Sequence, residues 1–155
     1  MADKTNAMRI LDKCKIEYSV HSYMGSGAVS GLGVAEVLGE DPSLVFKTLV
    51  TVGSSRNHYV FVIPVSKELD LKKAAKCVGE KSVAMVKSKE LLPLTGYIHG
   101  GCSPVGMKKQ FVTVLDVSAE KLPTVTVSGG KIGFQIELSL EDLKKVVPFI
   151  FGEIT

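Results

Sequence analysis

Hydrophobic positions along the chain predict five short helices. Apolar residues recur at intervals of three or four in these segments, which is the spacing that places them on one helix face. The predicted helices lie at about residues 5–15, 33–38, 70–78, 88–95 and 139–147. Four of them begin at a residue whose side chain can cap a helix, namely Thr5, Asp70, Ser88 and Ser139.

Alternating or continuously apolar runs predict seven strands between these helices. They cover residues 16–23, 45–52, 58–65, 83–86, 111–115, 124–127 and 133–138. A turn-forming segment, Gly53-Ser54-Ser55-Arg56-Asn57, separates the second and third runs, which therefore predict a β-hairpin. Because the order of elements is neither strictly βαβ nor all-β, we expect an α+β fold with one mixed central β-sheet surrounded by helices.

Length and composition predict one domain in a reducing compartment. The chain has 155 residues, 45% of them hydrophobic, which is enough for a single domain over residues 1–155 with a buried core. No signal segment and no apolar run of membrane-spanning length is evident, so we expect a cytoplasmic protein without membrane association. The three cysteines are widely spaced and form no C-x-x-C pair, which agrees with free thiols.

Charge is unevenly distributed along the chain. The formal net charge is +3, but residues 67–109 contain nine lysines and four acidic residues, a local charge of +5, and the remainder carries −2. A basic segment of this kind suits a polyanionic ligand. A lysine-rich, solvated helix face would explain the same pattern.

Two glycine-rich segments are candidates for loops. Residues 24–33 are small and glycine-rich but lack the glycine spacing of a dinucleotide site, so we interpret them as a mobile loop. Residues 96–107 hold four glycines and Pro104 between two apolar segments. Such a loop can expose directed N–H groups to an anion or a developing oxyanion, or it can be a tight connection only.

Candidate chemistry is sparse. Lys47 lies within a predicted strand, where a buried ammonium is costly unless it is paired or functional, although simple alternation would turn it toward water. The chain has no G-x-S-x-G, no H-E-x-x-H and no Cys/His metal spacing, so we expect neither a metal nor another cofactor. Cys102 near His99 suggests a thiol hydrolase, but nucleophile and base are normally distant in sequence.

Four motifs, taken together, resemble the YbaK/EbsC family of bacterial trans-editing proteins, which are related to the insertion domain of prolyl-tRNA synthetase. The resemblance spans residues 16–151. It is carried, in order, by Phe46-Lys47-Thr48-Leu49, by Ile63-Pro64-Val65 with residues 70–76, by Thr95-Gly96-Tyr97 with Gly100-Gly101-Cys102-Ser103-Pro104, and by Val127-Ser128-Gly129-Gly130-Lys131.

The resemblance implies a barrel-like, YbaK-like fold and hydrolysis of mischarged Cys-tRNA(Pro). In such proteins the cysteine thiol of the substrate is thought to attack its own ester carbonyl, which fits the missing protein nucleophile. The implied partners are the acceptor end of tRNA(Pro) and prolyl-tRNA synthetase, and the oligomeric state stays open. The alternatives are a deacylase for another mischarged tRNA, such as Ala-tRNA(Pro), and a non-catalytic module that binds tRNA or the synthetase.

The resemblance also assigns site residues by position. The implied catalytic residues are Lys47, Gly100 and Gly101, and the implied substrate-binding residues are Tyr23, Ser30, Thr48, Ser103, Pro104, Ser128 and Gly129. Two positions depart from the family pattern. Ser30 stands where an aromatic residue is frequent, and Ile132 stands where an arginine is usual.

Overall fold

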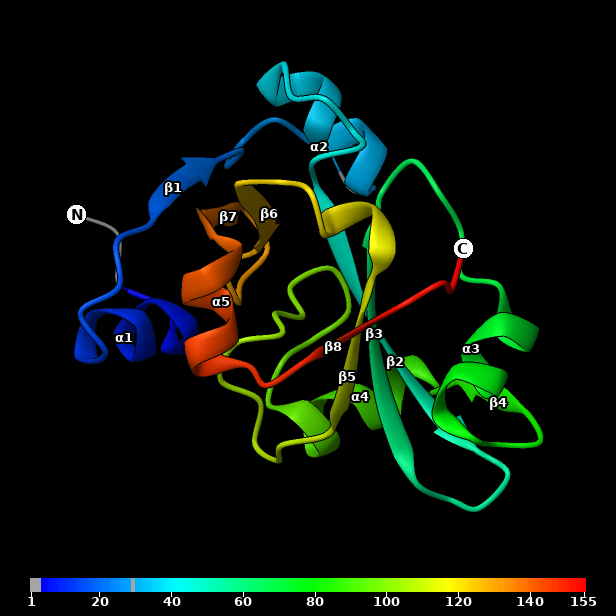
Figure 1. Ribbon diagram of the computed structural model, residues 1–155. Coiled ribbons are helices and arrows are strands. Elements are labelled where there is room, and N and C mark those ends of the chain that lie inside the picture. Colours follow the sequence, from blue (N-terminus) through cyan, green and yellow to red (C-terminus); the bar gives the residue numbers. More distant parts are fainter. Residues whose placement is uncertain (1–3, 29) are drawn as a thin grey trace.

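Short helices and strands alternate through the computed structural model, which describes residues 4–28 and 30–155 (Figure 1). The elements are α1 (Asn6–Lys13), β1 (Ser19–Ser22), α2 (Gly31–Leu38), β2 (Phe46–Gly53), β3 (His58–Pro64), α3 (Leu71–Val78), β4 (Val83–Met85), α4 (Ser88–Thr95), β5 (Val112–Asp116), a 3-10 turn (Val117–Ala119), β6 (Thr124–Ser128), β7 (Phe134–Ser139), α5 (Leu140–Val146) and β8 (Ile150–Gly152).

The strands form two sheets. The larger sheet has the order β4-β2-β3-β5-β8, and the smaller has the order β1-β7-β6. Pairing is antiparallel except at β3–β5 and β5–β8, so the larger sheet is mixed. A parallel bridge between Val45 and Thr126 joins the two sheets at the start of β2. The predicted α+β class is confirmed, but the strands are divided between two sheets.

The predicted hairpin is confirmed by β2 and β3, which pair from Phe46 opposite Pro64 to Val52 opposite His58. In Figure 1 these two strands are long and extend beyond the rest of the larger sheet. The turn of the hairpin is closed by the N–H of Gly53, which donates to the carbonyl of Asn57 at 2.8 Å. The hairpin carries the residue pair 47–48 at the end remote from this turn.

Three of the four predicted caps are confirmed. The side chains of Thr5, Asp70 and Ser139 accept backbone N–H groups in the first turns of α1, α3 and α5. Ser88 is instead the first residue of α4, and Lys87 stands at the cap position without a side-chain hydrogen bond.

Other predicted boundaries shift by a few residues. α1 ends at Lys13 rather than Lys15, because Lys15 has a φ of 58°, which does not continue a helix. α2 begins at Gly31 rather than Gly33, because the Ser30 hydroxyl accepts the N–H of Gly33 at 3.0 Å and caps the helix. The glycine-rich sequence of residues 24–33 predicts a loop, so the first turn of α2 is not evident from the sequence.

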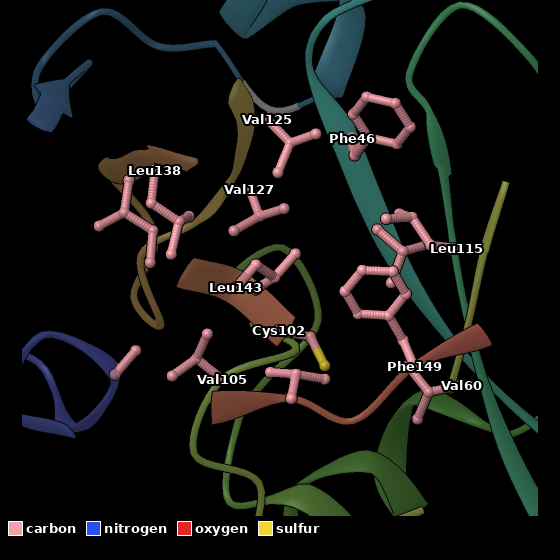
Figure 2. Packing of buried hydrophobic residues seen from close by; sticks show 14 of the residues in the cluster. Phe46, Val60, Cys102, Val105, Leu115, Val125, Val127, Leu138, Leu143 and Phe149 are labelled. Carbon is pink, nitrogen blue, oxygen red and sulfur yellow. The ribbon is translucent and has the colours of Figure 1, made fainter. Parts of the chain in front are cut away.

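The main core lies between the two sheets (Figure 2). Phe46, Val60 and Leu115 of the larger sheet face Val125, Val127 and Leu138 of the smaller one, and Cys102, Val105, Leu143 and Phe149 lie between them or at their edge. Burying each side chain of this size contributes about 1.5–3 kcal/mol. Residues 101–105 are buried, so the middle of the second glycine-rich segment is part of this core.

The opposite face of the larger sheet has a second cluster. Phe61, Ile63 and Val114 pack there with Ala74 and Ala75 of α3. The larger sheet is therefore covered on both faces, and β2 is held between two apolar layers. Among the residues that the structure describes, no helix is long and apolar enough to cross a membrane.

Candidate active site

A cavity of about 500 Å³ receives residues from both sheets and from the loop after α4. Six of the ten predicted site residues line it: Tyr23, Ser30, Lys47, Thr48, Gly100 and Ser128. They come from the end of β1, the cap of α2, strand β2, the loop and the end of β6. The structure thus brings together positions that are up to about a hundred residues apart in sequence.

Four predicted site residues, Gly101, Ser103, Pro104 and Gly129, do not line the cavity. All four are buried. The Ser103 hydroxyl accepts the N–H of Val105 at 3.2 Å, and the N–H of Gly129 donates to the carbonyl of Phe134 at 2.9 Å. These residues shape the two loops behind the cavity wall rather than the wall itself.

The glycine pair has two different local geometries. Gly100 is exposed and has a φ of 88°, a conformation that favours glycine. A Cβ at Gly101 would lie 3.0 Å from the backbone nitrogen of Ile132, so the second position needs glycine for close approach. The N–H of Gly101 donates to the carbonyl of Ile98 at 3.0 Å, whereas that of Gly100 has no acceptor in the described part of the chain. Gly100, which lines the cavity, is therefore the member of the pair whose N–H is not already used.

Lys47 is the cationic side chain of the cavity wall. It is partly buried on β2 and forms no ion pair within residues 4–28 and 30–155. No aspartate or glutamate of these residues lines the cavity. An anionic or carbonyl-bearing ligand therefore meets a positive wall without a competing carboxylate.

Thr48 adds a hydroxyl that has no hydrogen-bond partner. Its Oγ1 is buried, and among the described residues it is the one buried side-chain polar atom left unpaired. Buried polar atoms are nearly always hydrogen-bonded in folded proteins, so this hydroxyl is a candidate for a contact with a bound molecule.

Cys102 and His99 both line the cavity, but their surroundings do not make a nucleophile and a base. Burial raises the pKa of the Cys102 thiol to about 12, which keeps it protonated at neutral pH. His99 is exposed, and no hydrogen bond joins it to Cys102 in the described part of the chain. This geometry argues against a Cys102-dependent hydrolase.

Gln135, which no motif in the sequence identifies, lines the cavity from β7 and is only 5% exposed. The alternation of this strand places Gln135 and Glu137 on its polar face, and such a face ordinarily meets solvent. In the fold, Glu40, which follows α2, reaches the Gln135 amide. A glutamine in a predicted strand was the available signal, and it is a weak one.

A metal site is not evident in the described residues, where no three His, Cys, Asp or Glu side chains gather as ligands would. The cavity offers the Lys47 ammonium group, a small set of hydroxyl and amide groups, the His99 imidazole, the protonated Cys102 thiol and the backbone N–H of Gly100. Such a set can bind a polar ester and stabilise a developing oxyanion, but it supplies no attacking group.

Comparison with known proteins shows similarity over nearly the whole chain. The family model of the aminoacyl-tRNA editing domain matches residues 29–146. A protein of Enterococcus faecalis (strain ATCC 700802 / V583), assigned as the Cys-tRNA(Pro)/Cys-tRNA(Cys) deacylase EbsC, is 48% identical over 153 residues. The alignment covers 98% of this chain and 93% of that protein.

Two solved structures share the fold. A protein described as a trans-editing enzyme for prolyl-tRNA synthetase matches with a TM-score of 0.85 and 23% identity, covering 99% of each chain. The hypothetical protein APE2540 also matches with a TM-score of 0.85 and 23% identity, covering 96% of this chain and 98% of its own. At this identity the structural matches establish the arrangement of the sheets and helices.

Proposed function

Because this chain belongs to the aminoacyl-tRNA editing domain family, we propose that it is an aminoacyl-tRNA deacylase that hydrolyses mischarged Cys-tRNA(Pro). The name of the 48%-identical EbsC protein supports cysteinyl-tRNA as the substrate class. The observation that carries the proposal is the composition of the cavity. It combines Lys47, the unpaired Thr48 hydroxyl and the Gly100 N–H with a protonated Cys102, so the attacking group must come from elsewhere.

The substrate itself supplies that group. Its cysteine thiol attacks the ester carbonyl, the bond from the carbonyl carbon to the ribose oxygen breaks, and the thiol proton passes to the ribose oxygen. The resulting thiolactone then takes up water and becomes free cysteine. The thiol and the carbonyl already belong to the same cysteinyl group, so the task of the protein is to hold them in a reactive geometry and to stabilise the developing oxyanion.

The cavity residues take complementary parts in this reaction. Lys47 orients the ester or the terminal nucleotide through its ammonium group, and the Gly100 N–H stabilises the developing oxyanion. Tyr23, Thr48 and Ser128 bind the polar edges of the substrate. Gly101, Ser103, Pro104 and Gly129 hold the loops that present these groups, which is an indirect part in the site.

Prolyl-tRNA synthetase is the partner that we propose for selection of the tRNA. The net charge of +3 gives the isolated protein little long-range attraction for tRNA. A synthetase that already holds tRNA(Pro) would deliver the mischarged 3′ end. This proposal also places the protein in the cytoplasm, where bacterial translation occurs.

The test is deacylation of tRNA(Pro) charged with cysteine, alanine or serine, and of Cys-tRNA(Cys), with and without prolyl-tRNA synthetase. We expect cysteine to be released fastest, because alanine has no side-chain nucleophile and serine has a weaker one. Lys47→Met should lower kcat/KM for Cys-tRNA(Pro) by about 10- to 100-fold, the cost of losing a hydrogen bond from a charged group.

Two matched variants serve as controls. Lys76→Met removes an exposed lysine of α3 and should leave the rate unchanged, and Cys102→Ala should retain most of the activity. Full activity of Lys47→Met would remove that lysine from the site. Binding of tRNA without release of any amino acid would instead identify a non-catalytic module.

A further inference from the structure

A carboxylate outside the cavity contacts a buried amide in its wall. Gln135 lies on β7 and lines the cavity, whereas Glu40 follows α2 and does not line it. With the Gln135 amide nitrogen as donor, Nε2 lies 2.8 Å from Oε2 and 3.0 Å from Oε1 of Glu40. Both carboxylate oxygens therefore accept from one amide group.

Hydrogen-bond chemistry decides which way this amide is turned. An ionised carboxylate only accepts hydrogen bonds, so the reverse orientation would set Oε1 of Gln135 against two acceptor oxygens. The other end of the amide faces only donor groups, which suits Oε1. Oε1 of Gln135 is therefore the end of the amide that is turned away from Glu40, and Gln135 itself lines the cavity.

Within the described part of the chain, the Glu40 side chain has no hydrogen-bond partner except Gln135. Burial raises its pKa above the ordinary value, and the negative charge of Glu137 adds to this effect. Nearby His21 and the hydrogen bond from Gln135 act in the opposite direction and favour the carboxylate. The hydrogen bond from Gln135 to this partly buried carboxylate therefore orients a residue of the cavity wall.

An acceptor in this wall has a clear use for the substrate proposed above. An aminoacyl ester carries an α-ammonium group, which needs hydrogen-bond acceptors when it leaves water. No carboxylate of the described residues lines the cavity, so neutral oxygens must serve. An amide oxygen whose own N–H₂ group donates to a carboxylate is polarised and becomes a better acceptor.

We infer that Glu40 is a positioning residue that fixes the Gln135 amide, so that Gln135 Oε1 accepts a hydrogen bond from the α-ammonium group of the substrate. This inference rests on the proposed deacylase function. It assigns recognition of the amino group to β7 and leaves the ester to Lys47 and Gly100, on the β2 and loop side of the cavity.

The experiment compares two esters of tRNA(Pro) that differ only in the amino group. One carries cysteine, and the other carries 3-mercaptopropionate, which keeps the thiol and the ester. Glu40→Ala and Gln135→Met should each lower kcat/KM for the cysteinyl ester by about tenfold or more, the loss expected for a hydrogen bond to a charged group. The rate for the mercaptopropionyl ester should change by less than about twofold in the same samples.

Two further variants separate orientation from general stability. Glu40→Gln keeps an oxygen that accepts from Gln135 Nε2, so it should retain most of the preference for the amino group. Glu36→Ala removes an exposed carboxylate of α2 itself and should behave as the wild type. The ratio of the two rates does not depend on the folded fraction, so a poorly folding variant still gives a result.

The outcomes are distinct. Equal loss on both esters, or no loss on either, overturns the role of Glu40 and Gln135 while the deacylase function stands. If the wild-type protein hydrolyses neither ester, the proposed function is overturned. The proposed recognition of the ammonium group is then overturned as well.

Discussion

The thiol of Cys102 and the ammonium group of Lys47 line the same cavity in different surroundings. Cys102 is 8% exposed and its pKa is raised by burial, whereas Lys47 is only partly buried. Burial therefore keeps the Cys102 thiol from acting as a nucleophile and leaves the Lys47 ammonium group available to a ligand. This contrast distinguishes a positioning site from a thiol-dependent one.

The alkylation pattern of the cysteines tests this interpretation. Cys14 is exposed, so iodoacetamide at pH 8 should modify it readily, whereas Cys102 should stay unmodified as long as the protein is folded. Peptide mass spectrometry after a time course would give the two rates, and urea-unfolded protein provides the reference for a free Cys102. Rapid modification of Cys102 in the folded protein, with parallel loss of deacylation, would restore the thiol hydrolase as a hypothesis.

Among single residues, the sequence identifies charged and glycine residues of the site more readily than neutral polar ones. Lys47 was recognisable because a cation within an apolar strand conflicts with its neighbours. Gln135 caused no such conflict, because a glutamine is ordinary on the polar face of a strand. Only the tertiary fold shows that Glu40 and the cavity, rather than water, meet that face.

Among the elements, the β2–β3 hairpin is the one that carries the site, and Glu80 holds its turn. The Glu80 carboxylate accepts from the Ser55 hydroxyl, from the Ser55 N–H at 3.1 Å, and from the Tyr59 hydroxyl at 2.6 Å. These bonds, those of Ser55 foremost and then that of Tyr59, lower the pKa of Glu80 from 4.5 to about 2. A residue between α3 and β4 thus anchors the turn of a hairpin formed earlier in the chain.

A pKa that is lower in the folded state gives a pH-dependent contribution to stability. This contribution is present above the unfolded value of about 4.5 and is lost as the pH falls toward 2. Glu80→Gln should therefore lower the free energy of unfolding at pH 7, and its difference from the wild type should shrink between pH 4.5 and pH 2. Urea unfolding at several pH values measures this difference. Glu17→Gln, at an exposed position, is the control, and a difference that is independent of pH would contradict the mechanism.

Element type was predictable where apolar spacing and a cap coincide, as in α3 between Asp70 and Gly79. β8 escaped prediction because it has only three residues and follows Pro148, and its pairing with β5 brings together segments more than thirty residues apart. Loop 96–107 was identified as rich in backbone donors. The hydrogen bond from Gly101 to Ile98 shows that one of these donors is already used.

On the scale of the whole molecule, the division into two sheets creates the cavity. A single sheet would have put β2 and β7 in one plane, whereas two sheets joined at Val45 and Thr126 place their residues around a common space. Periodicity along the chain identifies strands but contains no information on which strands pair across long distances. The site residues could therefore be named from the resemblance, while the wall that they share required the fold.

Two lysines of the basic segment 67–109 flank a residue of the cavity wall. Lys87 and Lys89 are exposed and flank Ser88, which lines the cavity, so we expect the tRNA strand attached to a bound ester to pass close to them. Replacing both by alanine should lower kcat/KM for Cys-tRNA(Pro) at low salt and should reduce the dependence of log(kcat/KM) on log[salt] by about 1.4, as expected for two lost contacts to a single strand. The rate for cysteinyl-adenosine, which has no phosphate chain, should stay the same.

The matched control is Lys13→Ala with Lys15→Ala, which removes the same charge at the end of α1. Both double variants have an equal net charge, so a long-range effect of charge would slow them equally. If the lysines contact phosphates locally, losing these contacts slows only the double variant at Lys87 and Lys89. An equal effect of the two pairs would show that the basic segment attracts tRNA only through the overall field, and the path of the tRNA strand would then have to lie along another side of the cavity.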